Sequence, residues 1–194
     1  MANKAGKGSA YERQFCRDLS EWWTGGTRTD CFWRTAGSGG RATTRGKRGH
    51  DTAGGYGDIA ATDHEGAPFL HFMTLELKRG YSKQTVQDIL DKPMKAAQQP
   101  YEEWVEQARE SCLLSGAFGW AVVFRRDRRE SMILFHEGMW SQLRGVGAFN
   151  PSPLPLMQMQ FTIKGVWRGV VMMQLKAFFE CVTPEQIKQL ARRL

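Results

Sequence analysis

The sequence predicts an α/β domain in which amphipathic helices accompany short apolar strands. Apolar side chains recur at helical spacing in residues 9–23 and 101–114, whereas residues 69–78, 120–124 and 131–135 are apolar runs typical of strands. The chain has 194 residues, of which 41% are hydrophobic. One domain of ordinary size can therefore bury a substantial core.

The first helix is expected after a flexible basic tail at residues 1–8. Ser9 has the chemistry of an N-cap, and Glu12, three positions later, is its expected partner in a capping box. The apolar residues expected to form the buried stripe of this helix are Tyr11, Phe15, Leu19 and Trp22. Residues 31–34 follow as a short strand.

Residues 36–57 form a long segment with eight glycines and almost no bulky apolar side chain. Such a segment cannot bury enough surface to order itself, and loops of this length in a compact domain are usually functional or disordered. Its expected phosphate-binding residues are Arg41, Arg45, Lys47, Arg48 and His50. An inert surface loop is the alternative interpretation.

Three charged residues then follow in a pattern that predicts a metal site. Residues 58–62 and 69–78 favour a β-hairpin around the turn-forming segment 63–68. Side chains alternate along a strand, so Glu76 and Lys78 share a face, and the hairpin would bring Asp58 beside Glu76. Adjacent carboxylates repel unless a cation separates them, and their oxygens suit Mg²⁺. A lysine nearby can orient a water molecule or stabilise a phosphate anion.

The rest of the chain alternates between helices, strands and loops. A helix begins within residues 82–92 and is interrupted by prolines, and a charged turn at residues 125–130 contains Arg125 and Arg126. This turn is either solvated or a second phosphate-binding patch. The remaining expected elements are a linker at 145–155, strands at 157–163 and 166–173, and a helix capped by Thr183.

The composition favours an intracellular protein with an anionic partner. The formal net charge is +7, which indicates nucleic acid, although solubility alone would also explain it. Four widely spaced cysteines without a CxxC pair argue against zinc and indicate free thiols. No secretory leader is evident, and no apolar run reaches the roughly 18 residues of a membrane helix.

Taken in order, five features resemble the PD-(D/E)XK nuclease superfamily, and within it the archaeal-type and phage-encoded Holliday junction resolvases. The matching residues are Glu12 in a helix, Arg34 at the end of a strand, the Gly-Ser loop at 36–40, Gly-Asp-Ile at 57–59 and Glu-Leu-Lys at 76–78. Gly57 stands where the superfamily name has proline, a position that supplies turn geometry. The ordered set is far more specific than Asp and Glu-x-Lys alone.

The resemblance implies a restriction-endonuclease-like core, with a mixed central sheet of about five strands flanked by helices. This core would span residues 9–144, and residues 145–194 would pack on it or form a dimer interface.

The same resemblance implies the site residues. Asp58 and Glu76 would bind Mg²⁺, which Mn²⁺ is able to replace, and Glu12 would add a carboxylate directly or through water. Lys78 would assist the attacking water. The resemblance also gives a serine to the mobile loop, at Ser38.

A glutamine in the helix after the motif belongs to the implied site. Gln107 fits best because a strand follows it at the expected distance, and Gln98 is the alternative. Arg34, Arg125, Arg126 and the basic loop would hold the DNA backbone without reading bases.

The implied activity is that of a magnesium-dependent, structure-selective DNA endonuclease of the Holliday junction resolvase type, in a bacterium or a phage-infected cell. The two-fold character of a branched junction favours a homodimer. The alternatives are a restriction-like or general phage nuclease on linear duplex, a catalytically decayed DNA-binding protein, and a protein-interaction module with incidental charge.

Overall fold

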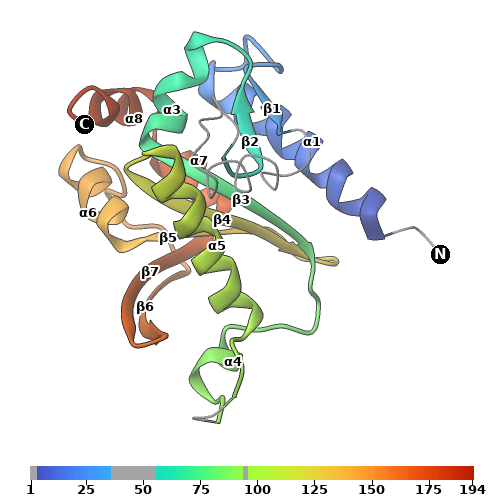
Figure 1. Cartoon of the computed structure of the whole chain (residues 1–194). Helices are drawn as coiled ribbons and strands as arrows, with labels where there is room; N and C mark the ends of the chain where they lie inside the picture. The colour runs from blue at the N-terminus through green and yellow to red at the C-terminus, as the bar shows by residue number, and fades with distance from the viewer. Residues whose placement is uncertain (1–3, 36–55, 94–95) are drawn as a thin grey trace.

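A five-stranded mixed sheet with the strand order β3-β4-β5-β7-β6 forms the centre of the molecule (Figure 1). The computed structural model describes residues 4–35, 56–93 and 96–194. The strands are β3 (Met73–Gly80), β4 (Gly119–Arg126), β5 (Ser131–His136), β6 (Leu156–Ile163) and β7 (Val166–Gln174). β3 and β4 are parallel, and the other neighbours are antiparallel. This mixed sheet with flanking helices confirms the predicted fold class.

Five helices contribute to the main core on one side of the sheet. They are α1 (Lys4–Trp23), α3 (Ala67–Phe72), α6 (Glu137–Gly145), α7 (Leu175–Cys181) and α8 (Pro184–Ala191). Because strand side chains alternate, Leu75 and Leu77 of β3 and Ala121 and Val123 of β4 all enter this core.

One long helix, α5 (Pro100–Ser115), packs on the opposite face together with the single turn α4 (Gln87–Leu90). The other set of β4 side chains, including Val122 and Phe124, packs against α5. A capping box between Gln99 and Glu102 begins α5. The helix expected at 101–114 is thus confirmed, whereas the one expected within 82–92 is reduced to four residues.

Helix α1 begins earlier than the sequence indicates, so the predicted cap at Ser9 is wrong. The helix starts at Lys4, which places residues 4–8 in the helix rather than in a tail. The hydroxyl of Ser9 accepts a hydrogen bond from Arg13 instead. Trp23 takes the fully buried position at the end of the apolar stripe, while Trp22 is half-buried and donates its indole N–H to the Phe179 carbonyl at 2.9 Å.

The predicted hairpin is also corrected. β2 (Ile59–Ala61) pairs with β1 (Phe32–Arg34) in a separate two-stranded antiparallel sheet, not with β3. Residues 69–72, expected as part of a strand, belong to α3. A short apolar run does not distinguish strand from helix, and here Phe69 and Phe72 bury themselves at helical spacing.

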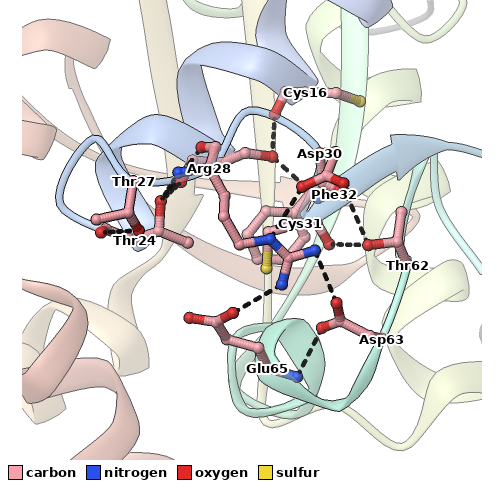
Figure 2. Close-up of polar contacts among 11 residues, drawn as sticks. Cys16, Thr24, Thr27, Arg28, Asp30, Cys31, Phe32, Thr62, Asp63 and Glu65 are labelled. Atoms are coloured by element: carbon pink, nitrogen blue, oxygen red, sulfur yellow. Dashed lines mark hydrogen bonds and ion pairs between the residues drawn. The ribbon is translucent and has the colours of Figure 1, made fainter.

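A charge network closes one end of this small sheet. The guanidinium of Arg28 binds the carboxylates of Asp30, Asp63 and Glu65 at 2.9, 2.8 and 2.8 Å (Figure 2). Asp63 also caps η1 (His64–Gly66), the turn that follows β2. The loop before β1 and the turn after β2 are therefore held at one cation.

The C-terminal segment completes the sheet and its core. β6 and β7 confirm the two predicted strands, and Thr183 and Gln186 form the expected capping box of α8. Helices α6 and α7 were not anticipated. The linker expected at 145–155 buries Ala148 and Phe149 and contains cis peptide bonds before Pro151 and Pro155.

All four cysteines are free thiols, as the sequence predicts. Within the described residues, each helix is too short or too polar to cross a bilayer.

Candidate active site

Asp58 lies against the outer edge of β3, and a glycine allows this approach. Its backbone N–H donates to the Leu75 carbonyl at 2.8 Å, and its carboxylate accepts the N–H of Leu77 at 2.7 Å. The preceding Gly57 has a φ of +73°, and a Cβ there would lie 2.6 Å from the Leu75 oxygen. Only glycine combines this conformation with such close contact. Asp58 thus satisfies backbone groups of an edge strand without belonging to the sheet.

Glu76 and Lys78 of β3 lie on the same face of the sheet, as the alternation along a strand predicts. Helix α5 covers this face. Glu76 is 1% exposed, and the ammonium of Lys78 donates to its carboxylate at 3.2 Å. A buried carboxylate on an apolar strand requires compensation, and Lys78 supplies part of it. The lysine side chain is itself only 12% exposed.

Helix α5 holds both charged groups through two residues one turn apart. The hydroxyl of Ser111 donates to Glu76 at 3.0 Å, and the side-chain oxygen of Gln107 accepts from Lys78 at 2.7 Å. Residues four apart lie on the same helical face, so α5 presents these two groups together. Of the two glutamine candidates, Gln107 contacts the motif, while the amide nitrogen of Gln98 is buried without a partner among the described residues.

The carboxyl groups of Asp58 and Glu76 interact directly, as the hairpin argument anticipated, although the route is different. Burial, and after it the negative charge of Glu76, raise the pKa of Asp58 to about 6. Lys78 and the Leu77 N–H act in the opposite direction but do not cancel these effects. The pair therefore carries more negative charge than the protein itself compensates.

Glu12 of α1 approaches the same centre from the helical layer. Its pKa is raised, first by burial and then by the charge of Asp58, while Arg34 lowers it. Arg34 binds Glu12 at 3.1 Å and also contacts the Ser9 hydroxyl. Because Ser9 is not a cap, Glu12 has no role in a capping box and its carboxylate is directed to Arg34.

A second group of potential ligands is occupied by a protein cation. Cys31, Asp63 and Glu65 place one ligand atom each within 4.8 Å of one another (Figure 2). Arg28 already binds both carboxylates, and burial raises the pKa of the Cys31 thiol to about 11, so that the sulfur stays protonated at neutral pH. This donor set suits a structural ion-pair network better than a metal.

The two predicted DNA-binding arginines of the charged turn lie on opposite faces of the sheet. β4 extends through both of them, and consecutive strand residues alternate in direction. Arg125 binds the carbonyl of Arg129, whereas Arg126 affects the pKa of Tyr101 on α5. They therefore form two separate positive positions rather than one patch.

The remaining predicted site residues lie outside the described part of the chain. They are Ser38, Arg41, Arg45, Lys47, Arg48 and His50.

Ser111 and Arg79 were not foreseen from the sequence. Ser111 follows Gln107 by four residues, a spacing that could have indicated it once Gln107 was assigned to a helix. Arg79 follows Lys78 directly and pairs with Asp127 at 3.0 Å, a contact that depends on the sheet register.

The geometry agrees with a comparison to known families. A family model described as "Phage putative PDDEXK endonuclease" matches residues 3–189, which is nearly the whole chain. No curated protein and no solved structure has significant similarity to this chain. The match includes Asp58 and the Glu76-Leu77-Lys78 triplet, the elements that the superfamily name describes. This chain therefore belongs to the phage PDDEXK endonuclease family.

Proposed function

We propose that this nuclease is a magnesium-dependent DNA endonuclease with a preference for branched DNA, like the Holliday junction resolvases, and that Asp58, Glu76 and Lys78 form its active centre. The observation that carries this proposal is the buried carboxyl pair, in which burial and then the charge of Glu76 raise the pKa of Asp58 to about 6. Such a pair is unfavourable in isolation and becomes favourable when a cation is bound.

The donor set fits a hard divalent cation. Asp58 and Glu76 offer carboxylate oxygens, the ligands that Mg²⁺ prefers, and Glu12 can add a third carboxylate through water. Mn²⁺ accepts the same ligands and is expected to substitute. When bound, the metal neutralises phosphate charge and lowers the pKa of a coordinated water.

Lys78 positions the water and stabilises developing charge. Its ammonium already binds Glu76 and Gln107, so its direction is set before substrate arrives. Its low exposure strengthens its interaction with an anion, because less water screens the charge. Gln107 is a positioning residue that acts through Lys78.

Backbone recognition is proposed for Arg34 and for the cations of the loop at residues 36–57, since phosphate contacts hold DNA without reading sequence. A homodimer would present two such centres to the two-fold arrangement of a four-way junction.

The first prediction concerns cleavage. Asp58→Asn and Glu76→Gln should each reduce the cleavage rate at saturating Mg²⁺ by at least about 100-fold, the scale of losing one preorganised charged group. The assay compares four-way junctions, flaps and plain duplex with Mg²⁺, Mn²⁺ or chelator.

Glu102→Gln is the matched control, because Glu102 is also 1% exposed but pairs with Lys92 away from the motif. Its cleavage should stay within about threefold of wild type. Cleavage that survives chelator, or that persists in both site variants, would contradict the proposed active centre. Equal cutting of duplex and junction would favour a general nuclease instead.

A further inference from the structure

A pocket of about 690 Å³ opens beyond the end of β3, next to the proposed active centre. Its lining comprises Arg79, Gly80, Tyr81, Ser82, Lys83, Gln84 and Asp127. The volume lies within the range of ligand sites. It begins one residue after Lys78, where the chain leaves β3 towards α4 (Figure 1).

Tyr81 supplies an accessible aromatic ring to this pocket. The residue is 46% exposed, and its φ of +29° is rare for any side-chain-bearing residue. Its ring meets Trp104 of α5 at 4.9 Å between centroids and at 71° between planes. The contact is edge-to-face, so no parallel ring stacks on Tyr81 among the described residues.

The pocket also offers positive charge. Arg79 is paired with Asp127, which offsets both charges, but Lys83 forms no ion pair with any described residue. An aromatic ring beside an available cation is the combination that holds single-stranded nucleic acid, since the ring stacks on a base and the cation binds a phosphate.

One turn of α5 connects the pocket to the active centre. Trp104 supports Tyr81 and Gln107 binds Lys78, and residues three apart are neighbours on one helical face. The three residues from Lys78 to Tyr81 span at most about 11 Å of chain. Because successive nucleotides of a DNA strand rise by about 3.4 Å, this distance corresponds to about three nucleotides.

We infer that this pocket binds an unpaired nucleotide of the substrate, with its base stacked on Tyr81 and a flanking phosphate on Lys83. A paired base in a duplex cannot expose its face to a tyrosine. The pocket therefore selects DNA that is single-stranded within a few nucleotides of the cut. The inference rests on the proposed function, for which it supplies selectivity towards branched DNA that carries unpaired nucleotides, such as a flap.

The test measures binding in chelator, so that it does not depend on catalysis. Fluorescence anisotropy gives the Kd for a plain duplex and for the same duplex with a single-stranded flap, and 2-aminopurine in the flap near the branch reports stacking. Tyr81→Leu should weaken flap binding about 5- to 150-fold and abolish the 2-aminopurine quenching, while duplex binding stays within about twofold.

Two further variants separate stacking from other effects. Tyr81→Phe keeps the ring and should behave as wild type. Trp167→Leu removes another exposed aromatic residue, on β7, and should leave flap binding unchanged. Lys83→Gln should reduce the salt slope of flap binding by about one, even if Tyr81→Leu fails to fold.

The inference would be overturned by a Tyr81→Leu variant that binds flap DNA like wild type, or by one that loses duplex binding equally. The inference would also be wrong if Tyr81→Phe weakened flap binding as much as Tyr81→Leu does. Failure of the proposed function appears differently, as absent metal-dependent cleavage with these binding differences intact.

Discussion

Asp58 combines two roles that usually belong to different residues. Its backbone and carboxylate bind the edge of β3, and the same carboxylate faces Glu76. The first role favours burial, while the second makes burial costly when the group is ionised. The balance between these roles makes the stability of the metal-free protein depend on pH.

The folded state raises the pKa of Asp58 from 3.8 to about 6. Protonation is therefore favoured in the folded state, and this contribution to stability is complete below about pH 4 and is lost as pH rises through about 6. The shift corresponds to at most about 3 kcal/mol. In chelator at pH 7.5, Asp58→Asn should melt above wild type, by about 2–4 °C for each kcal/mol recovered.

Scanning calorimetry with and without Mg²⁺ checks this expectation. Mg²⁺ should raise the melting temperature of wild type at pH 7.5, less so at pH 5, where the carboxyl must first lose its proton. The melting temperature of the Asp58→Asn variant should change little with Mg²⁺ at either pH. A wild type that melts identically with Mg²⁺ and chelator would argue against a metal at this pair.

Residue chemistry was the part of the site most accessible from sequence. The shared face of Glu76 and Lys78 was predictable because alternation on a strand is a property of local geometry, whereas Asp58 was placed beside Glu76 through a hairpin that does not form. Ser111 and Arg79 depend on which helix covers which strand and on the register between β3 and β4, and these are set by packing over long sequence separations. For Glu12 the sequence left two interpretations open, a capping box and a further carboxylate of the site, because Ser9 resembles a cap although α1 begins five residues earlier.

At the scale of elements, the small sheet β1–β2 positions Asp58 through one glycine. The sequence indicated both strands but paired β2 with β3, because a short turn favours a hairpin whenever two apolar runs adjoin. The structure inserts η1 and α3 instead, and the close approach at Gly57 restores the contact with β3.

Gly57→Ala tests this arrangement. Its Cβ would clash with the Leu75 carbonyl, and the left-handed conformation adds about 1–2 kcal/mol. We expect lower stability in urea denaturation and at least a tenfold loss of cleavage, because the displaced Asp58 no longer faces Glu76.

Gly25→Ala provides the control for conformational strain alone. Gly25 has a φ of +61°, but no heavy atom lies within 4 Å of the added Cβ. Backbone strain should lower the stability of this variant by a similar amount, while its cleavage rate should stay unchanged. Equal activity losses in the two variants would show that the contact at Gly57 has no special importance for the site.

At the scale of the whole molecule, residues 145–194 are integral to the core. β7 lies between β5 and β6, and Phe178, Ile187 and Leu190 belong to the same core cluster as Phe15 and Leu19 of α1. The sequence suggested a linker at 145–155 because Gly and Pro are frequent there, but Ala148 and Phe149 are buried and the segment is a packed connection.

A chain shortened to residues 1–144 should therefore lack a cooperative thermal transition. The shortened chain lacks β7 and so exposes the edge of β5. The loss of three buried side chains at about 2–5 kcal/mol each is as large as the whole stability of a typical domain. A chain ending at Ala191 is the control, because residues 192–194 are exposed. A folded 1–144 fragment would contradict this view of the core.

The hydrogen bond from Trp22 to the Phe179 carbonyl joins segments 157 residues apart. During translation at about 5–20 residues per second, the first helix waits roughly 8–30 s for its partner to leave the ribosome. Trp22 lacks its native covering by α7 in that interval, and contacts of such long sequence separation also slow the search for the native state. Chaperone occupancy of the nascent chain should consequently be highest on α1.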